Sequence, residues 1–207
     1  MSNEDGFEIP PQYLQRADSS PDELFYREPR FVAHIDEATI NALTEYYLEF
    51  IPSHARVLDL MSSWISHLPD ELELSRVAGL GMNEAELSRN PRLTDYCVHN
   101  LNDNPRLPYE PGTFERVTLA VSVQYLIQPI DVMSAVRDVL TEGGAICIAM
   151  SHRLFPTKAV AAFQQLPVRD RIQLVGYYLE RAGFRDVTFA DRSPEGADPL
   201  WLVTGTR

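Results

Sequence analysis

Short apolar runs alternate with polar or amphipathic segments along most of the chain. Five runs lie within residues 56–61, 76–82, 95–101, 115–122 and 144–150, and each predicts a buried strand. Each run is followed by a polar loop or by a segment with helical spacing, which is typical of crossover units in parallel sheets. The sequence therefore predicts an α/β fold with a mainly parallel sheet and helices on both faces.

Helical spacing of apolar residues predicts helices over 36–51, 130–142 and 172–182. The first has Asp36 as its N-cap, the second ends at the pair Gly143–Gly144, and the third ends at Gly183. Asn83 with Glu86 three residues later resembles a capping box and predicts a short helix after the second strand.

The two ends of the chain have different patterns. Residues 185–193 and 198–206 are strand-like and flank a turn-rich stretch, which predicts an antiparallel pair. Residues 1–35 are polar, contain four prolines in the first thirty positions and lack an apolar period. We therefore expect an N-terminal arm or lid over 1–35, followed by a single domain over 36–207.

Composition narrows the range of partners. With 30 acidic and 18 basic residues among 207, the net charge is −12, which opposes binding to nucleic acid and to anionic membranes. A small-molecule partner is favoured; the sequence predicts no oligomeric state. No apolar run is long enough to span a bilayer, and the N-terminus lacks the features of a secretory signal, so we expect a cytoplasmic protein. Cys97 and Cys147 lie in strand-like runs without metal-binding spacing, which predicts core residues and no metal.

Three stretches resemble motifs of one enzyme family, in the family's order. They are VLDL from Val57, LPYEPGTFERVTLAVSVQYL from Leu107 and VRDVLTEGGAICIAMS from Val136. They resemble class I S-adenosylmethionine-dependent methyltransferases, of the small-molecule, methyltransferase type 11-like kind. The resemblance implies a Rossmann-like, seven-stranded sheet with an antiparallel last strand, S-adenosyl-L-methionine as cofactor, and methyl transfer to a small-molecule acceptor.

The resemblance also implies where the cofactor binds, because ligands of such sheets lie beyond the carboxyl ends of the strands. Asp59 would attract the cofactor's ammonium group, although the same carboxylate could instead satisfy amides of its own turn. Met82 and Leu101 would sandwich the adenine. The positions implied as cofactor-binding are Asp59, Met61, Ser62, Ser63, Gly81, Met82, Asn83, Asn100, Leu101, Ala120 and Gln124.

The sequence departs from the family's pattern in three places. The loop after the first strand carries Met61, Ser63 and Ile65 where the family has glycines, and a side chain at positive φ costs roughly 1–2 kcal/mol. Gly81 stands where an acidic residue usually binds the ribose, and Asn100 stands where an Asp contacts the adenine. SSWISHLP and GMN resemble a subgroup of methyltransferase-like proteins from photosynthetic organisms, in which the missing glycines would be a shared feature.

Candidates for chemistry follow the fourth and fifth strands. Tyr125 and His152 are the catalytic candidates, with packing at a helix start and a solvated loop histidine as the respective alternatives. Trp64 could stack on a ligand ring, plug the cavity or pack in the core.

The N-terminal segment adds further candidates. It could bring Tyr26 and His34 over the site. Arg27 and Arg30 could hold an acceptor carboxylate there, with solvation at the surface as the alternative.

Three functions are compatible with these features. The first is a methyltransferase. The second is a catalytically silent binding or regulatory protein in which Trp64 and Ile65 fill the former cofactor space. The third, a dinucleotide-dependent reductase, is disfavoured because no GxGxxG follows the first strand and no acid ends the second.

Overall fold

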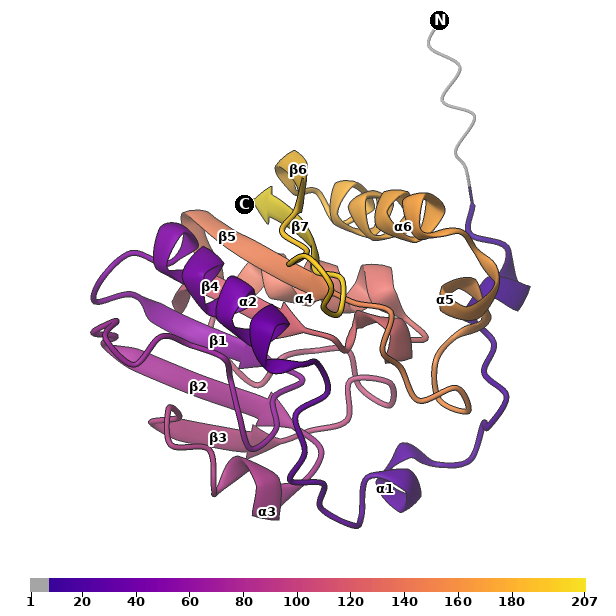
Figure 1. Ribbon diagram of the computed structural model, residues 1–207, viewed down its shortest axis with the longest axis horizontal. Helices are drawn as coiled ribbons and strands as arrows, with labels where there is room; N and C mark the ends of the chain where they lie inside the picture. Colours follow the sequence, from indigo (N-terminus) through magenta and orange to yellow (C-terminus); the bar gives the residue numbers. More distant parts are fainter. Residues whose placement is uncertain (1–7) are drawn as a thin grey trace, which may run out of the picture.

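Seven strands form one mixed sheet in the computed structural model, which describes residues 8–207 (Figure 1). The order is β3-β2-β1-β4-β5-β7-β6, with β7 antiparallel to both neighbours and the remaining pairs parallel. The predicted Rossmann-like fold is confirmed. The strands are β1 (Arg56–Leu60), β2 (Arg76–Gly81), β3 (Asp95–Val98), β4 (Phe114–Ala120), β5 (Leu140–Met150), β6 (Arg185–Asp191) and β7 (Trp201–Thr206).

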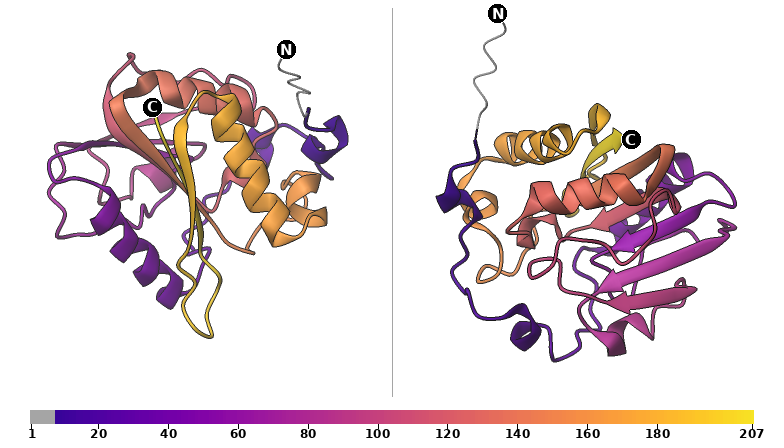
Figure 2. Two further views of the ribbon diagram at one scale, coloured as in Figure 1. Left: turned by 90° about the horizontal axis from the view of Figure 1, so that it is seen from above. Right: turned by 180° about the vertical axis from the view of Figure 1, so that it is seen from behind.

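Helices cover both faces of the sheet and create two separate apolar cores (Figure 2). On one face α2 (Glu37–Phe50) packs against alternate residues of the strands, including Val57 and Cys147. On the other face α4 (Pro129–Val139) and α6 (Val168–Arg181) pack against the intervening strand residues. Since the central strands are buried on both faces, they carry the continuous apolar runs seen in the sequence.

The predicted cap of α2 and the predicted stop of α6 are confirmed, whereas α6 begins at Val168, before the predicted 172. Asp36 caps α2 by accepting a hydrogen bond from Thr39 N at 2.9 Å. After α6, Gly183 has φ +86°, the left-handed conformation that ends many helices and that glycine adopts without strain.

The predicted end of the second helix is wrong. α4 stops at Val139, and β5 begins at Leu140 with no intervening loop. The pairing with β4 shifts there, because Leu140 pairs with Phe114 while Ala145 pairs with Arg116. The extra residues of β5 therefore form a bulge, and Gly143, at φ +72°, provides its left-handed residue.

No helix joins β1 to β2 in the described chain; residues 61–75 form a loop. Leu68 and Leu72 of this loop are buried in the same core as α2. The loop begins by crossing the end of β2, where Ser62 N donates to Leu80 O at 2.8 Å. A Cβ placed on Gly81 would lie 2.2 Å from Ser62 O, so only glycine permits this crossing.

The N-terminal arm, here residues 8–35, runs along the sheet edge where β1, β2 and β3 end (Figure 1). It contains two short helical turns, η1 (Pro11–Leu14) and α1 (Asp22–Phe25). Arg16 forms a β-bridge with Val160, just before α5 (Ala161–Gln165). The remaining elements are α3 (Glu84–Leu87) and η2 (Val123–Tyr125). Residues 1–7 of the predicted arm lie outside the described residues.

The crossing of Ser62 over Gly81 predicts a destabilising effect of Gly81→Ala. The added methyl group meets a backbone oxygen that cannot swing away, so we expect a loss of about 1–3 kcal/mol in the free energy of unfolding. Gly176→Ala is the matched control, because its Cβ would lie 3.7 Å from Val187 and alanine favours helix by up to about 1 kcal/mol. Urea unfolding measures both, and equal stabilities would contradict the proposed contact.

Candidate functional site

A cavity of about 310 Å³ lies beyond the carboxyl ends of β1, β2, β3 and β4. Its volume is at the lower end of the roughly 300–1,000 Å³ typical of small-molecule sites. The loop after β5 and the N-terminal arm complete its wall. Ten of the eleven predicted cofactor-binding residues line it, namely Asp59, Met61, Ser62, Ser63, Gly81, Met82, Asn83, Asn100, Leu101 and Ala120.

Asp59 is a buried carboxylate on the cavity wall, only 3% exposed. Ser62 Oγ donates to it at 2.5 Å, and Thr118 Oγ1 lies 3.4 Å away. No arginine, lysine or histidine of residues 8–207 forms an ion pair with it. Burial raises the pKa of Asp59 to about 6, so the group is mostly ionised at pH 7. A buried anion without a cation suits a cationic ligand group.

The loop after β1 keeps the cavity open despite its missing glycines. Of the three substituted positions only Met61 has a positive φ, at 55°, so Ser63 and Ile65 are accommodated without that strain. Ile65 lines the cavity. Trp64 turns away from it, because its Nε1 donates to Val32 O at 3.1 Å and its ring packs edge-on to Phe31.

Three non-glycine residues on the cavity wall are left-handed. They are Met61, His67 at φ 57° and Val121 at φ 48°. Val121 is β-branched and therefore the least tolerant of this conformation. Such residues cost of order 1–3 kcal/mol each and tend to cluster at functional sites, which supports a functional role for this cavity.

Asn83 lines the cavity but its side chain is fully engaged. It caps α3 by accepting from Glu86 N at 3.1 Å, and its Nδ2 donates to Tyr26 O at 2.8 Å and Arg27 O at 3.1 Å. The polar atoms of Asn83 therefore bind the arm and are not available to bind a ribose. The predicted capping box is half formed, because the Glu86 side chain does not return to Asn83.

Glu86 was not among the predicted site residues, because the sequence assigned it to the helix cap. Its carboxylate instead lines the cavity beside the end of β2. One oxygen accepts from Ser63 Oγ at 2.6 Å and the other from Arg30 N at 2.7 Å. Glu86 therefore joins three parts of the wall, namely α3, the loop after β1 and the arm.

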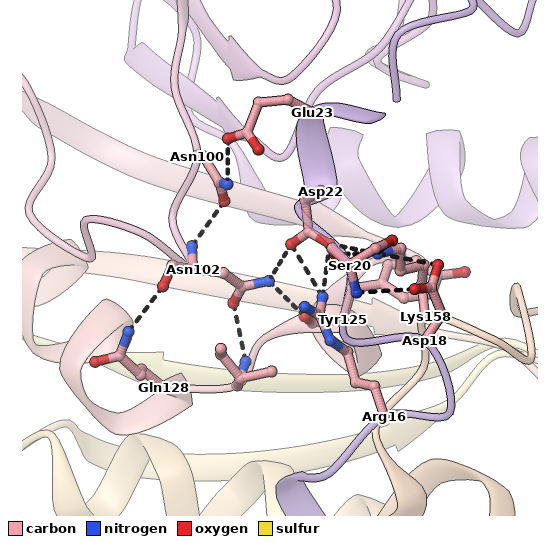
Figure 3. Close-up of polar contacts among 11 residues, drawn as sticks. Arg16, Asp18, Ser20, Asp22, Glu23, Asn100, Asn102, Tyr125, Gln128 and Lys158 are labelled. Carbon is pink, nitrogen blue, oxygen red and sulfur yellow. Dashed lines mark hydrogen bonds and ion pairs between the residues drawn. The ribbon is translucent and has the colours of Figure 1, made fainter. Parts of the chain in front are cut away.

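A buried polar network fixes the first half of the arm (Figure 3). Lys158 is fully buried, and its ammonium lies 3.2 Å from carboxylate oxygens of both Asp18 and Asp22. Arg16 adds an ion pair to Asp22 at 2.8 Å. Lys158 is the only lysine in the sequence. The arm is thus attached to the chain after β5 by a buried ion-pair cluster.

Asp22 also reaches the cavity wall and the loop after β3 (Figure 3). Asn102 Nδ2 donates to it at 2.8 Å, and Asn100 Nδ2 donates to Glu23 at 2.7 Å. Burial alone would raise the pKa of Asp22, but hydrogen bonds from Asn102 and Arg16 outweigh it and hold the pKa below its usual value. The carboxylate therefore stays charged and keeps its partners.

The predicted catalytic residues differ in placement. Tyr125 lines the cavity, and its hydroxyl accepts from Phe155 N at 2.8 Å. His152 lies outside the cavity wall, half exposed, with Nε2 3.1 Å from a carboxylate oxygen of Asp198. Gln124 also lies outside the lining, where its amide donates to the carbonyls of Val121 and Arg153. Of these three residues only Tyr125 lines the cavity.

Two further histidines line the cavity. His34, from the arm, packs edge-on to Phe155, and His67 has its Nδ1 buried without a hydrogen-bond partner among the described residues. Burial and the neighbouring His34 lower the pKa of His67 to about 4, and partial desolvation lowers that of His34, so both are neutral at pH 7. The sequence suggested His34 as a site residue but not His67, since no periodic pattern identifies a strained loop residue.

The remaining predictions concern the two cysteines, metal-binding groups and membrane-spanning helices. The prediction that both cysteines are core residues is confirmed for Cys147 and wrong for Cys97, which is half-buried because β3 is an edge strand. Within residues 8–207 there is no group of three or more His, Cys, Asp or Glu placed to hold a metal ion. In the same part of the chain no helix has the length and apolarity to cross a membrane.

Comparison with solved structures identifies the fold. The chain is similar to an S-adenosylmethionine-dependent methyltransferase from Mesorhizobium loti, with 18% identity, a TM-score of 0.58, and coverage of 81% of this chain and 100% of that one. For a methyltransferase from Archaeoglobus fulgidus the identity is 13%, the TM-score 0.61, and the coverage 83% and 95%. The chain is also similar to the [4+2]-cyclase SpnF, with 13% identity, a TM-score of 0.61, and coverage of 80% of each chain.

No protein-family model matches the sequence, nor does any curated protein sequence. At such low identities the structural similarity identifies the fold and leaves the reaction open. The fold is that of S-adenosylmethionine-dependent methyltransferases, as the sequence motifs predicted.

Asp59→Asn should stabilise the protein at neutral pH. The pKa of Asp59 is about 6 in the folded protein and 3.8 in the unfolded chain, so the folded protein binds the proton more tightly. The contribution of Asp59 to the free energy of unfolding therefore falls as the pH rises from about 4 to about 6. We expect the variant to lose that slope and to gain up to about 3 kcal/mol at pH 7. Urea unfolding across pH 4–7 measures this. The exposed Asp70→Asn is the control and should behave like wild type.

Lys158→Met should loosen the arm. Removing the ammonium leaves Asp18 and Asp22 close together with Arg16 as the remaining cation, and deletion of one partner of a buried pair is strongly destabilising. We expect amide hydrogen exchange over residues 18–30 to accelerate at least about tenfold, with α2 unchanged. The exposed Arg169→Met removes the same charge elsewhere and should leave the arm's exchange unaltered. Unchanged exchange in Lys158→Met would contradict the anchoring role.

Proposed function

We propose that the protein is a cytoplasmic S-adenosylmethionine-dependent methyltransferase that acts on a small molecule. The observation that carries the proposal is Asp59, a buried carboxylate without a cationic partner at the cavity end of β1. A ligand ammonium group would neutralise it. The methyltransferase fold and the cavity at the strand ends support this assignment.

The residues on the cavity wall can contact both the adenine and the ribose of the cofactor. Met82 and the buried Leu101 offer apolar contacts for the adenine, and Asn100 Oδ1 can accept from its amino group. Glu86 takes the place of the missing acid at the end of β2, because each of its carboxylate oxygens accepts one hydrogen bond, from Ser63 Oγ or Arg30 N, and keeps a lone pair that can accept from a ribose hydroxyl. Gly81 allows the loop carrying Ser62 and Ser63 to close over β2.

The chain's own residues would position the acceptor and exclude water. When bound, S-adenosylmethionine supplies a methyl group on a sulfonium, and its displacement needs alignment more than acid–base catalysis. The arm forms one wall of the cavity and would act as a lid. If the acceptor carries a proton, the neutral His34 is the better placed base, because burial lowers the pKa of His67 to about 4 and makes it a weak one.

Two observations favour a second function. Ile65 lines the cavity at a position where related loops have glycine, and Asn83 holds the arm with its polar atoms. These features suit a binding or regulatory protein that holds the nucleoside without turnover. The similar fold of a cyclase supports the view that this architecture is not restricted to methyl transfer.

Isothermal titration calorimetry with S-adenosylmethionine and S-adenosylhomocysteine tests the cofactor assignment. We expect both to bind, and Asp59→Asn to weaken binding at least tenfold, because a charged hydrogen bond contributes about 1.5–3 kcal/mol. Asp70→Asn should bind like wild type.

No heat with either compound at high micromolar protein would overturn the assignment. Affinity for both, without formation of S-adenosylhomocysteine during incubation with a panel of acceptors, would favour the binding protein.

A further inference from the structure

Arg30 is a cation on the cavity wall without a carboxylate partner. Of the arginines and lysines that line the cavity, Arg153 pairs with Asp198, whereas the Arg30 guanidinium forms no ion pair within residues 8–207. Its Nη1 atom is buried and has no hydrogen-bond acceptor there. Buried donors are normally hydrogen-bonded, so the unpaired Nη1 of this half-buried side chain indicates a missing acceptor, and a guanidinium is best matched by an anion.

The position of Arg30 is fixed from several sides. Its backbone N donates to Glu86 at 2.7 Å, and Nη2 donates to Phe25 O at 2.9 Å. The guanidinium carbon lies 4.4 Å from the centre of the Phe25 ring and 5.4 Å from that of Phe155. Such preorganisation lowers the entropy lost when an anion binds.

Aromatic side chains surround this cation. Tyr26, Tyr125, His34 and Phe155 line the adjacent cavity wall, and Tyr125 stacks on Phe155 with ring centres 5.8 Å apart. Ser122, 8% exposed, adds a hydroxyl oxygen without a partner among the described residues. The wall therefore combines flat apolar surfaces with the unpaired cation of Arg30 and the free hydroxyl of Ser122.

We propose that Arg30 recognises a carboxylate on the methyl acceptor, and that the acceptor is a small carboxylic acid with a flat apolar body. This inference rests on the proposed function. Phe155 and Tyr125 follow β5 and β4, away from the ends of β2 and β3 where the nucleoside is assigned. The methionine part of the cofactor has no flat apolar body to fill an aromatic wall, whereas an aromatic or unsaturated acid does.

The test uses the full chain with benzoate, phenylacetate and cinnamate as probes, each paired with its uncharged amide. Ligand-observed NMR titrations are run with and without S-adenosylhomocysteine. We expect at least one acid to bind wild type at least tenfold more tightly than its amide. Arg30→Gln should abolish that preference, and Arg30→Lys should retain part of it. Arg27→Gln, which removes an exposed charge from the same arm, should behave like wild type.

The cofactor is measured in the same variants, so that the two proposals fail separately. Arg30→Gln should bind S-adenosylhomocysteine and methylthioadenosine within about twofold of wild type. If Arg30→Gln weakens S-adenosylhomocysteine but not methylthioadenosine, Arg30 holds the cofactor's carboxylate and the inference is overturned. Equal binding of acids and amides by wild type also overturns it. Absence of S-adenosylhomocysteine binding in wild type removes the proposed function, whatever the acids do.

Discussion

The backbone contact between the loop after β1 and the end of β2 positions a connected group of polar residues on the cavity wall. Ser62 N bonds to β2, which places Ser62 Oγ on Asp59 and Ser63 Oγ on Glu86. Glu86 in turn accepts from the backbone of Arg30, so the arm is positioned by the same crossing. The wall of the cavity is thus one connected hydrogen-bonded unit rather than a set of independent loops.

This contact also explains how the fold tolerates a loop without glycines. A close approach of two backbones requires that one of them lack a Cβ at the crossing point, and here that residue is Gly81 of the strand. The loop can then carry Ser62 and Ser63, whose hydroxyls become part of the site. Part of the strain persists at Met61, which retains the left-handed conformation. The glycine that a close backbone approach requires is therefore supplied by the strand, at Gly81, and not by the loop.

Local patterns in the sequence predicted the sheet and its main helices, because burial on both faces produces apolar runs and Asp36 is a strong cap. The error at Gly143 arose because a glycine in the left-handed conformation suits a helix end and a bulge equally well, and pairing with β4 decides between them. The roles of Glu86 and His67 were not predictable, since each depends on contacts between segments distant in the chain. Asp59 was predictable because it ends a recognisable strand.

The buried Lys158 has a practical consequence. Because this sequence contains one lysine, and its side chain is fully covered where the arm meets the chain after β5, side-chain amine chemistry is restricted to that single junction. An acylating reagent would modify this ε-amino group only in molecules whose arm has detached. The rate of acylation at Lys158, relative to the rate in the unfolded chain, would then report how often the arm opens, with no engineered label.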